Sequence, residues 1–221
     1  MSVSDENRRP IRSRSWPIFR QFAARLASAG VSPNAISLSS IAFSVIAGLA
    51  FSATAKVEDD MVRRIFWLLG AIAVQLRLCA NLLDGLVAVE GGKGSAVGEL
   101  YNEAPDRVAD AAILVGVGFS LGGAPLLGAF ASVVAVFVAY VRALGASTGV
   151  GQVFLGPMAK QQRMALITLL AIYCAVSPLA WQANWFRSHG VVDAALLAII
   201  VGGLLTAGRR LARIATLLRE Q

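Results

Sequence analysis

The chain has 221 residues, of which 57% are hydrophobic and only 15% are charged, and its mean hydropathy is +0.67. Because a soluble domain carries charge on about a quarter of its residues, this composition excludes an ordinary soluble globular protein. The net charge of +7 would fit a nucleic-acid-binding protein. The positions of the basic residues instead indicate membrane topology and contact with anionic lipid, so we expect no nucleic-acid partner.

The segment before the first apolar run has two parts. Residues 1–15 form a basic tail rich in arginine. Residues 16–30 are predicted to form an amphipathic helix that lies in the membrane interface, with Arg20 and Arg25 away from the apolar side. The apolar side is made by Ile18, Phe19, Phe22, Ala23 and Leu26. We recognise no cleavage site and expect the segment to be retained.

Six apolar runs follow, each about long enough to cross a hydrocarbon core of roughly 30 Å. They cover residues 35–54, 65–89, 108–123, 124–146, 164–183 and 191–207. The sequence therefore predicts an all-α integral membrane protein. Residues 31–221 are expected to form a six-transmembrane-helix bundle behind the N-terminal amphipathic interfacial helix, with the whole chain in a single membrane domain.

Basic residues are unevenly shared between the two sides of this predicted bundle. Most of them lie before the first run, after the last run, or within residues 90–107 and 142–163. The positive-inside rule then places both termini in the cytoplasm. We expect a multi-pass protein of the cell inner or plasma membrane.

Polar side chains interrupt the apolar pattern at the end of the second run and the start of the third. Arg77, Asn81 and Asp84 are four and three residues apart, and a second row at intervals of four follows after a loop. This second row consists of Asn102, Asp106 and Asp110. Residues three and four apart lie on one face of a helix, so the two helices can present facing rows. Ionisable groups at membrane depth are functional candidates because an unpaired one is costly there.

Two readings of these rows follow from the residue types. In the first, Arg77 and Arg107 simply neutralise Asp84 and Asp106 in structural ion pairs. In the second, the clustered carboxylate and amide oxygens bind a hard cation such as Mg²⁺, Mn²⁺ or Ca²⁺. A dication beside the basic residues of the cytoplasmic side would suit phosphate chemistry. Those basic candidates are Lys93, Arg142, Lys160 and Arg163.

The spacing of the polar residues resembles the signature of the CDP-alcohol phosphatidyltransferases, D-x2-D-G-x2-A-R-x8-G-x3-D-x3-D. The matching positions are Asn81, Asp84, Gly85, Ala88, Val89, Gly98, Asn102 and Asp106. The segments "GVSPNAIS" and "YVRALGAS…GPMAKQQR" also resemble the family's entry to its first span and its region between spans four and five.

This resemblance implies an enzyme of phospholipid biosynthesis. Family members transfer a phosphatidyl or related group from CDP-diacylglycerol or another CDP-alcohol to an acceptor hydroxyl, with release of CMP. One or two Mg²⁺ or Mn²⁺ ions would be held by Asn81, Asp84, Asn102 and Asp106, and Asp106 would also be the catalytic base. The resemblance implies a cytoplasmic active site and a homodimer.

The resemblance also implies two binding regions around the metal site. The CDP-lipid would be bound by Pro33, Asn34, Ser37, Gly85 and Ser95. An acceptor or phosphate group would be bound by Arg142, Lys160 and Arg163. The acceptor itself stays open between glycerol 3-phosphate, inositol phosphate, serine, another lipid and an unphosphorylated alcohol.

Three positions depart from the family signature, and all of them change charge. Asn81 and Asn102 replace aspartates, and Val89 replaces the arginine. Asp110, one turn beyond Asp106, is a candidate extra metal ligand. The departures leave three functions open: an active transferase with a modified site, a catalytically impaired relative that binds CDP-lipid or regulates a partner, and a cation-linked transporter. Retention of Asp106 favours the first.

Overall fold

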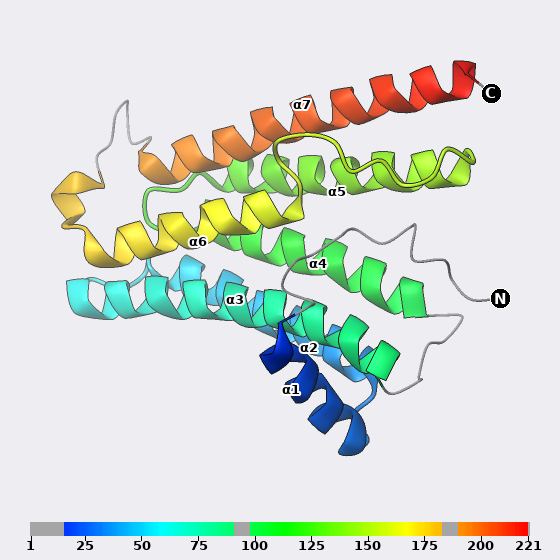
Figure 1. Cartoon of the computed structure of the whole chain (residues 1–221). Helices are drawn as coiled ribbons and strands as arrows, with labels where there is room; N and C mark the ends of the chain where they lie inside the picture. Colours follow the sequence, from blue (N-terminus) through cyan, green and yellow to red (C-terminus); the bar gives the residue numbers. More distant parts are fainter. Residues whose placement is uncertain (1–15, 91–97, 183–189, 221) are drawn as a thin grey trace.

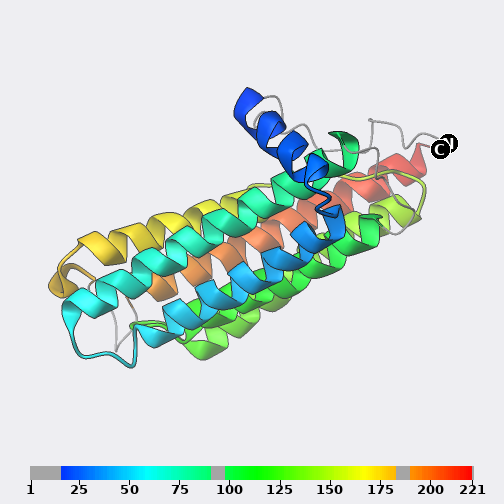
Figure 2. The same cartoon turned by 90° about the horizontal axis from the view of Figure 1, so that it is seen from below.

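The computed structural model describes residues 16–90, 98–182 and 190–220, and within these ranges the chain contains helices and no strands. The elements are α1 (Pro17–Ser28), α2 (Pro33–Ala53), α3 (Asp60–Glu90), α4 (Gly98–Gly118), α5 (Pro125–Ser147), α6 (Lys160–Val176), the short 3₁₀ turn η3 (Leu179–Trp181) and α7 (Val191–Arg219). Helices α2 to α7 run along one common axis, and α1 lies across the bundle (Figures 1 and 2). The predicted basic tail, residues 1–15, lies outside the described ranges.

Four helices in the described ranges are long and apolar enough to cross a membrane. They are Pro33–Ala53, Asp60–Val89, Pro125–Ser147 and Val191–Arg219. Helices α4 and α6 lie in the same bundle, but the charged residues in their first turns make them less apolar. The observed fold is therefore an all-helical integral membrane bundle with four helices that qualify as spans by length and composition.

Some helices are longer than the apolar runs that predicted them, because polar residues next to those runs are also helical. Helix α4 begins at Gly98 rather than at residue 108, and α7 continues to Arg219 rather than ending at residue 207. The prediction that the fifth run stays helical to residue 183 is wrong. Helix α6 ends at Val176, because Pro178 disfavours a helical conformation at Ser177, the residue before it.

Helix α1 packs beside the end of α3. It begins with Pro17 at its first position, where the missing N–H of proline costs no hydrogen bond. The buried Ala23 packs in a cluster with residues of α3 that include Leu83 and Val87. Trp16 and Ile18 are exposed on the outside of α1. The helix therefore joins the bundle through one face and leaves large apolar side chains uncovered on another.

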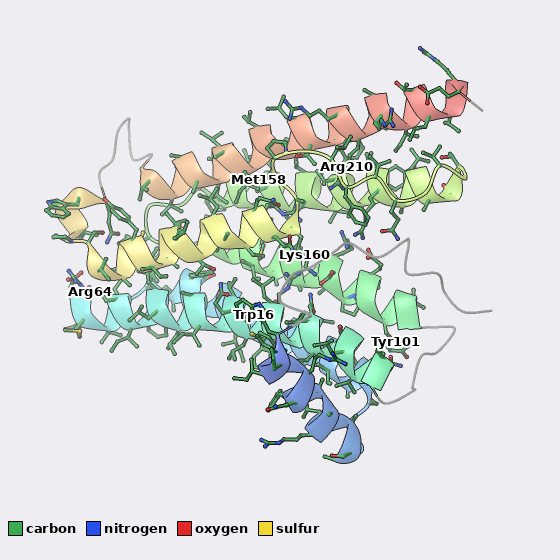
Figure 3. The ribbon with its side chains drawn as sticks, viewed as in Figure 1. Trp16, Arg64, Tyr101, Met158, Lys160 and Arg210 are labelled. Carbon is green, nitrogen blue, oxygen red and sulfur yellow. The ribbon has the colours of Figure 1, made fainter. Side chains whose placement is uncertain are left out.

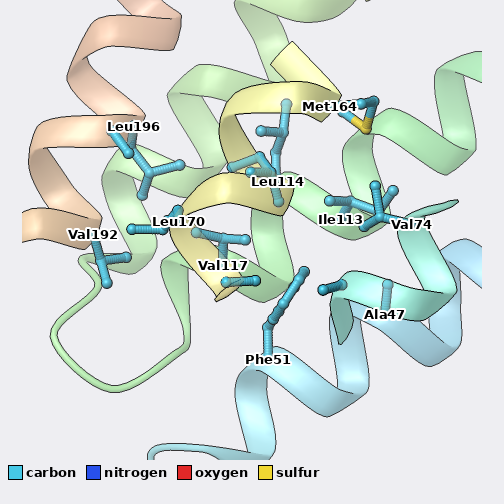
Figure 4. Close-up of a cluster of buried hydrophobic side chains, with 14 of the residues drawn as sticks. Ala47, Phe51, Val74, Ile113, Leu114, Val117, Met164, Leu170, Val192 and Leu196 are labelled. Atoms are coloured by element: carbon cyan, nitrogen blue, oxygen red, sulfur yellow. The ribbon is translucent and has the colours of Figure 1, made fainter. Parts of the chain in front are cut away.

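The main apolar core is formed by residues of all six helices from α2 to α7. Its largest members include Trp67 together with Phe51, Ile113, Met164 and Leu196, and all five are fully buried. The last four are labelled in Figure 4. The rings of Phe51 and Trp67 pack at a tilt of 45°, with their centroids 5.5 Å apart. Burial of these side chains fixes the helices around the polar side chains described below.

Helices α2 and α4 touch through their backbones. A Cβ built on Gly48 would lie 2.5 Å from the carbonyl oxygen of Ala112, and one built on Gly116 would collide with the backbone of Gly48. Small residues permit this close approach between helices in a membrane. The contact holds α2, which carries Ser37, against α4, which carries Asp106.

Candidate functional site

Polar side chains from α2, α3, α4 and α6 meet inside the bundle. Helix α2 contributes Ser37, α3 contributes Arg77, Asn81 and Asp84, α4 contributes Asp106 and Asp110, and α6 contributes Lys160 and Arg163. The three aspartates are at most 5% exposed. The structure thus brings the first polar row together with Asp106 and Asp110 of the second, and it adds one side chain from α2 and two from α6.

Asp106 accepts hydrogen bonds from three other side chains. Arg77 donates from Nη2 at 3.1 Å, and Asn81 donates from Nδ2 at 2.5 Å. Lys160 donates from Nζ to the other carboxylate oxygen at 2.5 Å. Lys160 lies in the first turn of α6, between this helix and α4 (Figure 3). The predicted base is therefore a buried carboxylate that two cations neutralise.

Asp110 is held by two arginines. Arg77 Nη2 donates to Oδ1 at 2.6 Å, and Arg163 Nη2 donates to Oδ2 at 2.5 Å. The same Nη2 of Arg77 thus bridges Asp106 and Asp110. Both oxygens of Asp110 are engaged by cations, so its charge is already compensated within the protein.

Asp84 has a different environment. Ser37 Oγ donates to Oδ2 at 2.7 Å, and the backbone N–H of Gly85 donates to Oδ1 at 2.5 Å. Within the described ranges Asp84 forms no ion pair, although the residue is only 4% exposed. A buried carboxylate that accepts hydrogen bonds only from neutral donors would be stabilised by a bound cation.

The structure agrees in part with the first interpretation of the polar rows, in which Arg77 and Arg107 neutralise Asp84 and Asp106. Arg77 does pair with Asp106. Arg107 pairs with Glu103 at 2.8 Å and lies 3.9 Å from Asp106. Asp84 pairs with neither arginine. The spacing of four residues between Glu103 and Arg107 is a pattern that could have identified their pair from the sequence.

The predicted phosphate-binding residues divide into two groups. Lys160 and Arg163 lie in the buried network with Asp106 and Asp110. Arg142 instead pairs with both oxygens of Glu103 at 2.5 Å, and its guanidinium lies 5.9 Å from the ring centroid of Phe154. Sequence reasoning missed Glu103 as the partner of Arg142, because the two residues belong to different helices.

The remaining predicted residues lie at the start of α2 and around the α3–α4 connection. Pro33 is the first residue of α2, and its carbonyl accepts a hydrogen bond from Ser37 Oγ at 3.2 Å. Asn34 is half-buried in the same turn. The side chain of Asn102 and the whole of Lys93 and Ser95 lie outside the described residues.

The donor atoms near Asp84 fit a divalent ion. Among the described residues, no three His, Cys, Asp or Glu side chains gather as a metal-binding group. However, amide oxygens are also ligands of Mg²⁺ and Mn²⁺. Asn81 lies one turn before Asp84 and hydrogen-bonds Asp106, so two carboxylates and one amide lie close together. The uncompensated Asp84 and this all-oxygen donor set suit one hard dication.

Comparisons of the sequence point to one class of lipid synthase. No family model matches the chain. The phosphatidylinositol phosphate synthase of Mycobacteroides abscessus is 25% identical over 205 residues, which cover 90% of this chain and 84% of that protein. The enzyme of the same name from Streptomyces avermitilis is 26% identical over 212 residues, covering 92% and 79%. The archaetidylinositol phosphate synthase of Pyrococcus horikoshii is 26% identical over 159 residues, covering 68% and 74%.

Solved structures share the fold. The crystal structure of Mycobacterium tuberculosis phosphatidylinositol phosphate synthase with CDP-DAG bound has a TM-score of 0.71 at 18% identity, covering 90% of this chain and 94% of that one. The structure of the same enzyme with manganese and citrate also has a TM-score of 0.71 and covers 90% and 89%. This chain therefore has the fold of a phosphatidylinositol phosphate synthase, and its relatives are CDP-alcohol phosphatidyltransferases.

Proposed function

We propose that the chain is a divalent-metal-dependent CDP-alcohol phosphatidyltransferase of phospholipid biosynthesis. It transfers the phosphatidyl group of CDP-diacylglycerol to the hydroxyl of an alcohol and releases CMP. The observation that carries this proposal is the buried group of Asp84, Asn81 and Asp106, in which Asp84 lacks a cation partner among the described residues. The proposal is also supported by the similarity of this chain to two phosphatidylinositol phosphate synthases over about nine tenths of its sequence.

The metal would be held by oxygen atoms of Asn81, Asp84, Asn102 and Asp106. A bound Mg²⁺ or Mn²⁺ supplies positive charge that neutralises the pyrophosphate of the CDP-lipid and stabilises the departing CMP. Arg77 already places a positive charge on Asp106 and Asp110. This internal charge supports one ion rather than two. Asp110, whose oxygens both meet arginines, would orient those arginines and would not be a ligand.

Asp106 would remove the proton of the acceptor hydroxyl. The hydroxyl oxygen then forms a bond to the phosphorus that carries diacylglycerol. The bond from that phosphorus to the oxygen it shares with the CMP phosphate breaks, and CMP leaves with the electron pair. Lys160, whose Nζ contacts Asp106 at 2.5 Å, would help to orient this carboxylate in the site.

The CDP moiety would bind beside the start of α2 and the end of α3, near Pro33, Asn34, Ser37, Gly85 and Ser95. The hydrogen bond from Ser37 to Asp84 supports this placement, because it joins the start of α2 to the proposed metal ligand. Gly85 has no side chain and leaves the α3 backbone beside Asp84 open to a nucleotide.

We propose that the acceptor is a phosphorylated alcohol, with inositol phosphate as the first candidate. The three relatives are all named as synthases of inositol phosphate lipids. Lys160 and Arg142 are partly exposed, with side-chain exposures of 27% and 21%. The phosphate of the acceptor could displace Glu103 from Arg142, because phosphate and carboxylate groups both bind a guanidinium.

We further propose that the chain forms a single membrane domain with six spans, α2 to α7. The 21 residues of α4 have a length of about 32 Å, which is enough to cross the hydrocarbon core. The exposed Trp16 and Ile18 of α1 support an interfacial position for this helix. Both termini and the active site would face the cytoplasm of a cell inner or plasma membrane, and the enzyme would be a homodimer, as the family resemblance implies.

Two other functions make different predictions. An impaired relative would bind CDP-lipid without releasing CMP. A cation-linked transporter would need polar residues to continue across the membrane from Asp110. Instead, α4 continues with the fully buried Ile113, Leu114 and Val117. The packed apolar core in this direction favours an enzyme over a transport path.

The direct test is CMP release by the purified protein from CDP-diacylglycerol with Mg²⁺ or Mn²⁺ and a panel of acceptors. We expect release with inositol phosphate and loss of release in Asp106→Asn, with helicity and elution volume unchanged. Asp60→Asn, at the opposite end of α3, is the matched control and should stay active. Tight binding of CDP-diacylglycerol without CMP release, for every acceptor, would support the impaired relative instead.

A further inference from the structure

The segment between α5 and α6 is fastened to α7 directly before the first residue of α6. Thr206 Oγ1 accepts a hydrogen bond from the backbone N–H of Met158 at 2.9 Å. Arg210, one turn further along α7, donates from Nε to the carbonyl of Leu155 at 2.9 Å. It also donates from Nη1 to the carbonyl of Val138 in α5 at 3.0 Å. Met158, Lys160 and Arg210 lie in the same part of the bundle (Figure 3).

The side chains that make these bonds are built into the interior. Thr206 is fully buried and Arg210 is 3% exposed. Gly156 has a φ of +110°, and a Cβ there would lie 2.5 Å from Thr206 Cγ2. A glycine is therefore required where the segment passes over Thr206. The close approach and the two backbone hydrogen bonds fix the path of residues 155–158 against α7.

Helix α6 depends on this attachment for the position of its first turn. Its N-cap residue, Ala159, offers no side-chain hydrogen bond to the helix. Along its length, α6 packs chiefly against α3 and only slightly against α7. The carbonyl of Met158 also accepts a hydrogen bond from Arg163 Nη1 at 3.3 Å. Met158 therefore links α7, through Thr206, to Arg163, which contacts Asp110, and it precedes Lys160, which contacts Asp106, by two residues.

We propose that Thr206 and Arg210 are positioning residues for the transfer reaction, which hold Lys160 against Asp106 through the backbone of residues 155–158. This inference rests on the proposed function, because it assigns the contact between Lys160 and Asp106 to the reaction. The lysine stem is long and has several rotatable bonds, so the place of its amine depends on the place of its backbone. Neither positioning residue touches the reacting groups.

The first experiment compares Thr206→Val with Thr206→Ser. Valine keeps the shape of threonine but removes the acceptor for the Met158 N–H, whereas serine keeps the hydroxyl. We expect Thr206→Val to lower kcat/KM for the acceptor about fivefold, the equivalent of one ordinary hydrogen bond, with KM for CDP-diacylglycerol unchanged. Thr206→Ser should keep kcat/KM within about twofold of the unmodified enzyme.

The second experiment asks whether Thr206 acts through Lys160. Thr206→Val is measured again in a Lys160→Met background, by the sensitive detection of labelled CMP. If Thr206 acts by placing Lys160, its effect should shrink to less than about twofold there, because interacting positions are not additive. An undiminished fivefold effect in this background would overturn the inference.

Arg210 provides a second, independent variant. Arg210→Lys retains a donor for one of the two carbonyls and should lose less kcat/KM than Arg210→Met. The matched control is Arg209→Gln, an exposed arginine of the same helix turn, which should leave kcat/KM unchanged. A loss in Arg210→Met no larger than that in Arg209→Gln would contradict a positioning role for Arg210.

These outcomes are separate from the test of the proposed function. Absence of CMP release by the unmodified protein with every acceptor would refute the proposed function itself. CMP release by the unmodified protein, with Thr206→Val and Thr206→Ser equally active, would refute only the positioning role. Thermal unfolding of each variant in detergent shows whether a loss of activity accompanies a loss of fold.

Discussion

Arg77 provides a quantitative test of the buried charge network. Its guanidinium is fully buried and bridges Asp106 and Asp110, while Lys160 and Arg163 provide the other positive charges. Replacing Arg77 by methionine keeps much of the side-chain volume, and it leaves two cations, Lys160 and Arg163, among the three buried aspartates of the site. Removal of one partner from a buried ion pair costs about 3–5 kcal/mol.

The expected size of the effect can be measured as a melting temperature. For a chain of this length, each kcal/mol corresponds to roughly 2–4 °C, so Arg77→Met should lower Tm by about 10 °C. Circular dichroism of the purified protein in detergent follows the loss of helix. The control is Arg64→Met, which removes a partly exposed arginine from the same helix and should change Tm by less than about 3 °C.

A second substitution tests the electrostatic cause. In Arg77→Met combined with Asp110→Asn, one positive and one negative charge are both absent, and we expect about half of the lost stability to return. If the double variant is less stable than Arg77→Met alone, the charges do not compensate each other and the reasoning is refuted.

Four further outcomes follow from the site. Ser37→Ala removes an orienting hydrogen bond from Asp84 and should weaken Mn²⁺ binding about tenfold in calorimetry. Asp84→Asn should abolish Mn²⁺ binding and CMP release, since it neutralises a buried carboxylate of the site that forms no ion pair with the described residues. Asp110→Asn should lower Tm yet leave Mn²⁺ affinity within about twofold, because Arg77 and Arg163 occupy both of its oxygens. Chelation by EDTA should stop CMP release, and added Mg²⁺ or Mn²⁺ should restore it, whereas persistent activity without metal would contradict the metal site.

The sequence predicts the helices well in those segments that are both apolar and helical. All six apolar runs contribute to helices α2 to α7, because a backbone in lipid must satisfy its own hydrogen bonds. Hydropathy cannot detect a helix that continues into polar surroundings. This is why the first turns of α4 and the last turns of α7, with Arg209 and Arg213, extend beyond the predicted runs.

The site is predictable within a helix but not between helices. Intervals of three and four residues place Asn81 with Asp84, and Asp106 with Asp110, on shared faces. The bond from Ser37 to Asp84 joins residues 47 apart in sequence, and that from Lys160 to Asp106 joins residues 54 apart. No spacing rule reaches so far, since these contacts depend on how the helices pack.

The glycine contact between α2 and α4 is a point about which a change in the angle between these helices would move the residues of the site. Ser37 lies about 16 Å along α2 from Gly48, and Asp106 lies about 15 Å along α4 from Gly116. A tilt of only about 5° at this contact would therefore swing Ser37 by roughly 1.4 Å relative to Asp106, by the geometry of a straight helix. A shift of about 1 Å can cost a reaction about a hundredfold in rate. One methyl group added at Gly116 would therefore slow the reaction by changing the angle between α2 and α4, although it lies far from any reacting atom.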